Sequence, residues 1–429
     1  MQRASILSVF CFFALAISLH AQPTDISRWF GNTALTQPQG FNNGDPLRLT
    51  WGMAALNAPI QDTEFGTPLG TPNNLQTRLN AIYGSQSVWQ PILQSTFDRW
   101  SSVSGLSFQF ESNDDGAPVV ASPGVAGVRA DIRIAGKALD GNSNVLAYNY
   151  FPNNGDMVID TDDSFYNDTS SNSLRLRNVV LHEIGHGLGM AHVKSNDANF
   201  LLESSYSPAF DGPQYHDILV AQRGYGDVYE KSFNGLGNDV VERATSLGTV
   251  LSGGALSIGN DARSLVVLPS AVDFVSIDDS TDTDFYQFSI SDVGTVSISL
   301  DALGFTYNAT NQDGAGNIPF NTAARSDLGF SLLGTDGSTL LANVNASGLG
   351  GVEVLSNFQL AAAGSYFIRI NGINNSDTNP IDTQFYGLSI GFTAVPEPGS
   401  FVLLALAGLS AGVVPRRKFK ALDVRKIHA

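Results

Sequence analysis

The sequence predicts an α+β domain followed by an all-β sandwich. At 429 residues the chain is long enough for two or more domains. Its texture changes near Asn234, where mixed helix and strand patterns give way to repeated alternating runs. Three of its six histidines fall between His182 and His192, ahead of that change. We therefore expect a functional site in the first domain.

The first domain, expected over residues 22–233, opens with a Gly/Asn/Pro-rich segment that should wrap the surface. Alternating apolar residues predict three strands, at 47–51, 106–110 and 130–134. Apolar spacing of three and four residues predicts helices over 90–100, 174–190 and 217–225.

The second domain is expected over residues 234–394. Alternating runs recur in it and turn signals separate them, at Phe285–Ile290, Val296–Leu300, Phe330–Leu333, Tyr366–Ile370 and Phe385–Phe392. This pattern is typical of an antiparallel β-sandwich. The sequence of this half contains no recognisable catalytic constellation.

The histidine-rich stretch has the spacing of a metal site. His182 and His186 lie four residues apart, on one side of a helix that turns every 3.6 residues or so. Gly189 lets the chain turn back, so His192 can arrive as a third ligand. Three protein ligands with an open position are typical of catalytic zinc. The alternative, three histidines buried on a core helix, explains neither Glu183 nor the glycine turn.

The stretch reads H-E-x-x-H-x-x-G-x-x-H, which is the signature of metzincin zinc peptidases. Residues 45–228 resemble the matrixin branch of that clan. The resemblance implies a catalytic domain with a twisted mixed sheet and long helices. It implies that His182, His186 and His192 bind catalytic Zn²⁺. It also implies that Glu183 is the general base and then shuttles the proton to the leaving amine.

The sequence departs from the matrixin pattern at several positions. Leu202 stands where the methionine of the Met-turn is expected, and a swap of similar volume should be tolerated. Tyr148 and Val158 stand where two histidines of a second, structural zinc belong, so that zinc is not expected. Tyr206 and Tyr215 are candidates to help hold the oxyanion.

The run from Asp140 to Asp163 resembles the matrixin calcium loop. The resemblance implies Ca²⁺ ligands from the carboxylates of Asp140, Asp160 and Asp163 and from the backbone oxygens of Gly141, Ser143 and Val145. It implies a second Ca²⁺ position at Asp131 and Asp156. Carboxylate and carbonyl oxygens suit Ca²⁺. A solvated loop rich in Asp and Asn is the alternative.

The second domain resembles the bacterial pre-peptidase C-terminal module over residues 238–392. The resemblance is carried by the run from Asp282 to Phe288, by Leu333 to Leu340 and by Gly364-Ser365-Tyr366. Such modules usually accompany secreted peptidases. The aspartates at 279–284 are read as a solvated turn in preference to a Ca²⁺ site.

Both ends of the chain resemble export signals. Residues 1–21 combine Arg3, an apolar run and Ala21, as in a secretory signal peptide. Residues 395–418 combine Pro396-Glu397-Pro398, an apolar stretch at 401–414 and a basic cluster, and resemble the PEP-CTERM sorting tail. The resemblance implies a Gram-negative bacterium, an exosortase partner and transient inner-membrane contact, with 419–429 as a basic cytoplasmic tail. A plain membrane anchor over 401–414 is the alternative.

Composition agrees with an exported protein. The formal charge is −17 and the only cysteine, Cys11, lies in the expected leader. An acidic chain lacks the basic face that nucleic-acid binding needs. We therefore predict a secreted zinc metalloendopeptidase acting on extracellular proteins or peptides. The alternative is a surface-anchored matrix or adhesion protein whose metzincin-like domain is not catalytic.

Overall fold

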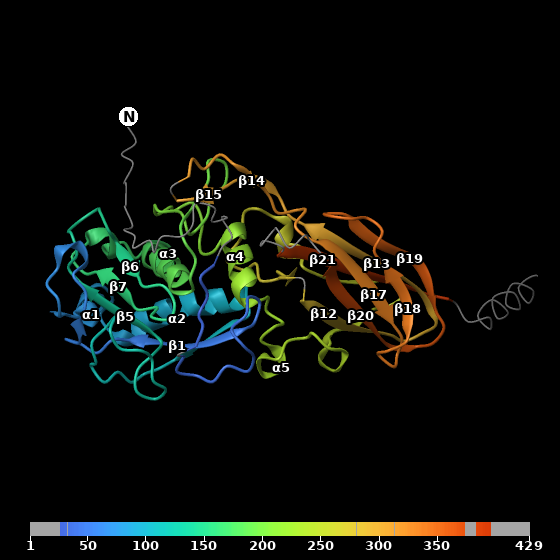
Figure 1. Cartoon of the computed structure of the whole chain (residues 1–429), viewed down its shortest axis with the longest axis horizontal. Helices are drawn as coiled ribbons and strands as arrows, with labels where there is room; N and C mark the ends of the chain where they lie inside the picture. The colour runs from blue at the N-terminus through green and yellow to red at the C-terminus, as the bar shows by residue number, and fades with distance from the viewer. Residues whose placement is uncertain (1–25, 32, 280, 313, 374–382, 396–429) are drawn as a thin grey trace, which may run out of the picture.

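The computed structural model describes residues 26–31, 33–279, 281–312, 314–373 and 383–395. The expected signal peptide (1–21), most of the sorting tail (395–418) and the basic tail (419–429) lie outside them. Within the described ranges, no helix is long and apolar enough to cross a membrane. Figure 1 shows an elongated molecule, with helices and a sheet at one end and a strand-rich lobe at the other.

The first lobe is built on a five-stranded mixed sheet. The strand order is β4-β1-β5-β7-β6, with β1, β4, β5 and β7 parallel and β6 antiparallel to β7. Its elements are β1 (Leu47–Met53), β2 (Pro59–Ile60), η1 (Glu64–Gly66), β3 (Thr71–Pro72), α1 (Leu75–Tyr83), α2 (Gln86–Ser102), β4 (Leu106–Phe110), β5 (Ile132–Lys137), β6 (Ala147–Asn149), β7 (Met157–Asp160), η2 (Ser164–Asn167), α3 (Ser170–Gly187), β8 (Val193–Lys194), α4 (Tyr215–Tyr225) and α5 (Ser232–Gly235). The α+β prediction is confirmed.

Apolar residues at the predicted spacing hold α2 and α3 against this sheet. Trp51 of β1 stacks on Phe97 of α2, with ring centroids 4.5 Å apart. The indole N–H of Trp100 donates to the carbonyl of Leu181 in α3 at 3.0 Å. Burial of such aromatic faces contributes most of the packing free energy of a core. Helix α2 therefore holds the metal-site helix α3 in position through this hydrogen bond and the surrounding packing.

The sequence predicted that the N-terminal segment wraps the surface. At residues 26–31 the structure differs, because Trp29 is buried. The Trp29 indole N–H donates to the carbonyl of Gly187 at 2.7 Å, and Ser27 N–H donates to the carbonyl of Gly189 at 3.0 Å. A Cβ at Gly189 would meet the Ser27 oxygen at 2.1 Å, and Gly189 has φ +99°. Only glycine satisfies both conditions where the helix ends and the chain turns toward His192.

The second lobe is a two-sheet sandwich, as predicted. One sheet has the order β10-β21-β13-β19 with β11 beside β21, and the other has the order β18-β17-β20-β12-β9. All of these pairs are antiparallel except β9 with β12. The elements are η3 (Val241–Arg243), β9 (Thr245–Thr249), β10 (Ala255–Ile258), η4 (Asn260–Arg263), β11 (Ser276–Ile277), β12 (Thr283–Ile290), β13 (Gly294–Leu303), β14 (Thr306–Asn308), β15 (Thr310–Asn311), β16 (Pro319–Asn321), β17 (Asp327–Leu333), β18 (Leu340–Val344), β19 (Val352–Leu360), β20 (Gly364–Ile373) and β21 (Gln384–Ala394).

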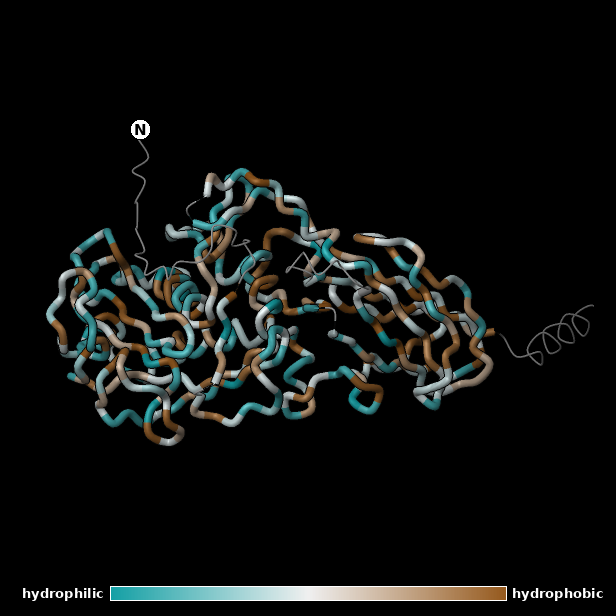
Figure 2. The backbone as a smooth tube through the Cα atoms, viewed as in Figure 1, coloured by the Kyte–Doolittle hydropathy of each residue, from teal (hydrophilic) through white to brown (hydrophobic). Residues whose placement is uncertain are grey.

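The hydrophobic core of the first lobe extends into the second lobe, although the sandwich also has a core of its own. Phe274, Tyr307, Phe320 and Phe385 lie beyond the expected boundary at 234, yet they pack in the cluster that contains Tyr215. Figure 2 shows hydrophobic segments running through both lobes. The boundary at 233/234 stays a prediction, but the two halves do not pack as independent bodies.

Candidate metal centre

Helix α3 places the first two histidines and Glu183. Ser171, Asn172 and Ser173 have positive φ, so its right-handed part begins at Leu174, as predicted. Val180, Ile184 and Leu188 form the buried face against the core. The C-terminal part of α3 thus presents His182 and His186 on the side away from that face.

Three imidazole nitrogens converge where the sequence predicts zinc. The Nε2 atoms are 3.1 Å apart for His182 and His186, 3.0 Å for His182 and His192, and 3.1 Å for His186 and His192. All three side chains are buried. They form a group of the size that holds one metal ion.

The Nδ1 atoms fix the state of the rings. His182 Nδ1 lies 2.7 Å from the carbonyl oxygen of Leu201, and His186 Nδ1 lies 2.8 Å from that of Met190. His192 Nδ1 lies 2.6 Å from Gln312 Oε1. Each of these oxygens accepts, so each Nδ1 carries the proton.

Burial keeps all three rings neutral. It lowers the pKa of His186 to about 4 and the pKa values of His182 and His192 well below 6.5. A neutral ring with its proton on Nδ1 has a bare lone pair on Nε2. Three such lone pairs at about 3 Å repel one another unless a cation lies between them. The donor set therefore fits a zinc ion with three protein ligands.

Glu183 is buried on the same helix. Neither carboxylate oxygen has a hydrogen-bond partner among the described residues. Burial raises the pKa of this carboxyl well above 4.5. A buried carboxylate without a donor is costly unless a cation or a substrate proton compensates it. Its place beside His182 is the one that the predicted general base requires.

The turn at residues 200–203 supports the histidines from below. Asp217 accepts hydrogen bonds from the backbone N–H groups of Leu201 at 2.7 Å and Leu202 at 3.1 Å. It thereby holds the Leu201 carbonyl that orients His182. The Leu202 side chain is buried and lies 2.9 Å from where a Cβ of Gly185 would stand. Leu202 thus packs directly beneath the metal-site helix, where the Met-turn methionine was expected.

The structure brings the main calcium-loop residues close together. Asp163 Oδ2 accepts from Ser143 N–H at 3.0 Å, and Asp140 accepts from Val145 N–H at 3.3 Å. Asp160 Oδ2 is buried and has no partner among the described residues. Burial, with Asp163 and Asp140 nearby, raises the pKa of Asp160 to about 6. Gly141 takes positive φ in the turn. Calcium ligation here stays a prediction.

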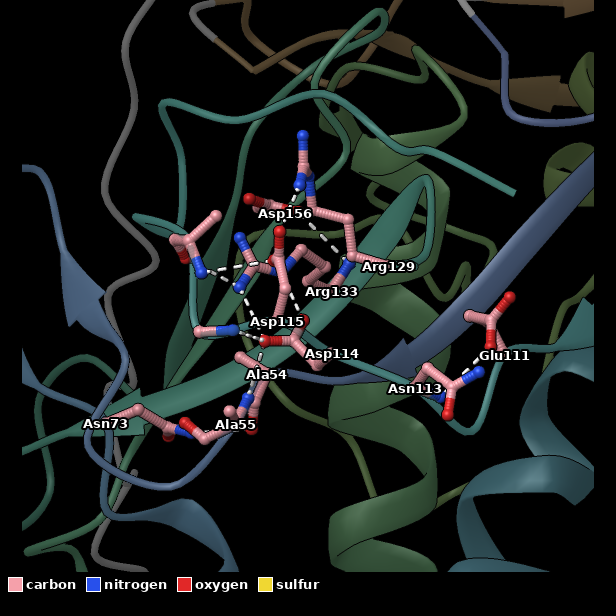
Figure 3. Close-up of polar contacts among 12 residues, drawn as sticks. Ala54, Ala55, Asn73, Glu111, Asn113, Asp114, Asp115, Arg129, Arg133 and Asp156 are labelled. Carbon is pink, nitrogen blue, oxygen red and sulfur yellow. Dashed lines mark hydrogen bonds and ion pairs between the residues drawn. The ribbon is translucent and has the colours of Figure 1, made fainter. Parts of the chain in front are cut away.

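Asp131 and Asp156 are instead occupied by separate backbone donors. Asp131 accepts from Ala34 N–H and from Thr50 N–H, at 2.6 and 2.8 Å. Asp156 accepts from Val120 N–H and from Arg133 N–H, at 2.6 and 3.0 Å. Figure 3 shows Asp156 beside the ion pair of Arg133 with Asp114. The second calcium position stays a prediction, and the structure gives these carboxylates a different role in joining loops to strands.

The two tyrosines proposed for the oxyanion have other surroundings. Tyr215 is buried between the lobes, packed on Phe305 and Phe385, so its assignment to the oxyanion is wrong. Tyr206 is half-buried and contacts Phe165 edge-on. Tyr148, at one position of the second matrixin zinc, donates its hydroxyl to Asp62 at 2.7 Å, and Asp62 also pairs with Lys137.

A second acidic group was misread from the sequence. Glu230, Asp282 and Asp284 place carboxylate oxygens within 4.8 Å of one another. Asp284 Oδ1 is buried without a partner among the described residues, while its Oδ2 accepts from the Tyr386 hydroxyl at 2.6 Å. Burial raises the pKa of Asp284 to about 7. The expected solvated turn is therefore wrong at Asp284, which lies buried in β12, while Asp282 just before the strand is half-buried and Glu230 comes from the segment after α4.

Gln312 contacts a predicted metal ligand, and the sequence analysis did not single it out. It lies 120 positions after His192 and in the other lobe. An isolated Gln in a loop carries no local signal, and its partner is set only by the packing of the two lobes.

Comparison with known proteins agrees with the geometry. Residues 78–226 match the matrixin peptidase family. The chain is 32% identical to metalloendoproteinase 4-MMP of Arabidopsis thaliana over 165 residues, which are 36% of this chain and 38% of that one. It is 29% identical to stromelysin-1 of Rattus norvegicus over 157 residues, covering 34% of this chain and 28% of the relative. The chain thus spans well under half the length of these relatives.

Two solved structures are similar at low scores. The first is the pre-peptidase C-terminal domain of a Bacillus anthracis collagenase. The match includes 34% of this chain and 95% of that domain, with 15% identity and a TM-score of 0.20. The structure of myroilysin covers 50% of this chain and 74% of its own, with 18% identity and a TM-score of 0.19. The family match and the histidine triad carry the assignment without them. Residues 78–226 are thus similar to a matrixin peptidase domain, and the histidine triad lies within the matched residues.

Proposed function

We propose that the chain is a secreted zinc metalloendopeptidase that hydrolyses peptide bonds of extracellular proteins. One observation carries the proposal. Three neutral imidazoles direct their Nε2 atoms at one point, and beside them stands the buried Glu183 carboxylate, for which the described residues supply no hydrogen-bond donor. A metal site with three protein ligands and an adjacent base is the arrangement of hydrolytic zinc enzymes.

The chain's own groups have distinct tasks in the reaction. Zinc, when held by His182, His186 and His192, polarises the scissile carbonyl and lowers the pKa of a water toward about 7. Glu183 takes the proton from the attacking water while the carbon–oxygen bond forms. It then delivers that proton to the amine nitrogen as the carbon–nitrogen bond breaks. Water is added across the peptide bond, and Glu183 returns to its starting state.

Secretion and surface sorting rest on the terminal segments. The signal-like residues 1–21 and the sorting-like tail at 395–418 support export of the two lobes across the inner membrane. An exosortase would process the tail, and the apolar stretch at 401–414 would contact the membrane in transit.

Calcium is proposed as a structural cofactor at two places. The first is the loop of Asp140, Asp160 and Asp163, where Asp160 Oδ2 is buried without a partner among the described residues. The second is the group of Glu230, Asp282 and Asp284 between the lobes. Clustered carboxylates shielded from water are stabilised by a hard divalent cation.

The decisive experiment compares Glu183→Gln with the parent, both loaded with zinc. We expect the variant to bind zinc normally and to lose on the order of 10²–10⁴-fold in kcat on casein or gelatin, because the base is gone and the ligands remain. The exposed Glu242→Gln is the matched control and should cleave like the parent.

Two results would contradict the proposal. Cleavage by Glu183→Gln at the parent's rate would reject Glu183 as the base. A zinc-loaded parent that cleaves no member of a peptide library would favour the alternative, an adhesion protein with a non-catalytic metzincin-like domain.

A further inference from the structure

An extension of the second lobe reaches the metal centre. We define the arm as residues 304–312 and 314–322, which connect β13 to β17 and carry β14, β15 and β16. Figure 1 shows β14 and β15 standing away from the sandwich and lying over the first lobe near α4. A plain sandwich hairpin would join β13 to β17 without leaving the second lobe.

Backbone pairing ties the arm to the segment that follows His192. Strand β15 pairs antiparallel with β8, with Thr310 opposite Lys194 and Asn311 opposite Val193. Asn308 donates to Asp197 twice, from its backbone N–H at 2.9 Å and its side-chain amide at 2.8 Å. The arm is therefore in fixed register with the third metal ligand.

An aromatic contact anchors the arm from inside. Tyr307 is buried, and its hydroxyl lies 2.8 Å from His216 Nδ1. Its ring packs on Phe200, with centroids 5.2 Å apart, and on Phe320 of the arm at 5.8 Å. Phe200 begins the turn that supports His182. The arm thus fixes that turn as well as the strand after His192.

The end of β15 places Gln312 on the third ligand. Gln312 Oε1 lies 2.6 Å from His192 Nδ1. The other two histidines take their acceptors from the first lobe, at the Leu201 and Met190 carbonyls. We propose that Gln312 is a positioning residue for the metal centre, and that the second lobe completes the zinc site in this way. The inference rests on the proposed function only in taking His192 as a ligand.

The physical role of Gln312 follows from the imidazole. An acceptor at Nδ1 keeps the proton there, leaves the lone pair at Nε2 and stops the ring from rotating. Loss of such a partner typically weakens metal affinity about 10–100-fold. His192 lies beyond the end of α3, so the helix does not hold it as it holds His182 and His186.

The test measures zinc affinity by chelator competition in the full chain, without substrate. Gln312→Asn keeps the amide but shortens the reach by one methylene, and Gln312→Leu removes the acceptor. Both should bind zinc roughly 10-fold or more weakly than the parent. Gln312→Glu keeps an acceptor and should restore affinity to at least the parent's level. Cobalt-loaded Gln312→Asn should have an altered visible spectrum, because one ligand is misplaced.

Asn196→Ala is the matched control. Asn196 donates to the Ala315 carbonyl of the arm at 3.3 Å and does not touch His192 in the described contacts, so its loss should leave zinc affinity unchanged. The inference is overturned if Gln312→Asn and Gln312→Leu bind zinc within about 3-fold of the parent. It is also overturned if Asn196→Ala weakens zinc as much as they do, since the arm would then act only through general packing. These readouts need no peptidase activity, so failure of the proposed function would be seen separately in the Glu183→Gln comparison.

Discussion

Single acceptor atoms decide the chemistry of this centre. Each metal-site histidine donates a hydrogen bond from Nδ1 to a protein oxygen, which leaves Nε2 for the metal. Arg133 is likewise buried with its hydrogen-bond partners in place. Its guanidinium donates to Asp114 through two nitrogens, at 2.8 and 3.0 Å, and also to the Ala117 carbonyl. In both cases a buried polar group is tolerated because its partners are complete.

Asp114 and Asp115 allow a comparison of a buried ion pair with an exposed one and of what each contributes to the unfolding free energy. The Asp114 side chain is 6% exposed in its pair with Arg133, whereas that of Asp115 is 41% exposed in its pair with Arg129. Asp114→Ala leaves a buried guanidinium without its carboxylate and should lower the unfolding free energy by about 3–5 kcal/mol. Asp115→Ala should leave the unfolding free energy nearly unchanged, because an exposed ion pair is screened by water. Urea denaturation measures both, and equal losses would refute the distinction.

At the scale of elements, the turn at 200–203 and helix α4 act together. The Asp217 carboxylate at the start of α4 receives N–H groups from the turn and from Gln214. The turn then supplies the Leu201 carbonyl to His182 and the Leu202 side chain to Gly185. Helix α4 is therefore a support of the metal helix, although the two are far apart in the sequence.

Leu202→Met should be tolerated. Methionine has a similar volume and adapts to irregular gaps, so the unfolding free energy should change by less than about 1.5 kcal/mol. Leu202→Ala opens a cavity beneath Gly185 and should cost about 2–5 kcal/mol. Thermal or urea unfolding separates the two. If methionine costs as much as alanine, the described packing of Leu202 is incorrect.

Asp217 gives a pH dependence. Burial raises its pKa from 3.8 to about 6, so the folded chain binds this proton more tightly than the unfolded chain. Its contribution to stability is fully present below about pH 4 and is lost as the pH rises through about 6. The unfolding free energy of the parent relative to Asp217→Asn should therefore fall across that window, by about 3 kcal/mol. Denaturant titrations at pH 4, 5, 6 and 7 measure it, and a difference that does not vary with pH would contradict the assignment.

Local patterns predicted most elements. The β4 strand has the predicted bounds, and the right-handed part of α3 starts at the predicted residue, because alternation and helical spacing are local signals. The three histidines of the candidate metal centre followed from their spacing together with the metzincin motif, which is also a local signal. Helix α1 was missed, since only Leu75 and Leu79 of its nine residues are buried and the apolar stripe is short. Tyr215 was assigned wrongly and Gln312 was missed, because the neighbours of each come from the other lobe.

At the scale of the whole molecule, a shared hydrophobic cluster joins the two lobes, and the sandwich also has a core of its own. Their common core includes Tyr215 from one lobe and Phe385 from the other, with ring centroids 5.1 Å apart. The acidic group of Glu230, Asp282 and Asp284 lies at the same junction. The stability of the contact between the lobes therefore depends on apolar packing and on compensation of the negative charge of these carboxylates.

Calcium removal should test that junction. A chelator selective for calcium over zinc should lower the Tm of the parent, and calcium at about 100 times its Kd restores about 2.7 kcal/mol per site. Asp284→Asn should remove the response of the junction, and Asp160→Asn that of the calcium loop. The exposed Asp292→Asn should respond like the parent. Equal responses of all variants in calorimetry would show that calcium does not bind at these positions.

The contact between His192 and Gln312 also sets an order of events at the ribosome. The two residues are 120 positions apart, and synthesis adds roughly 5–20 residues per second. His192 therefore emerges roughly 6–24 s before the residue that orients it. Throughout that interval the nascent chain carries all three histidines and Glu183 without a finished metal centre, so a metal centre built this way is completed only after most of the chain has been made.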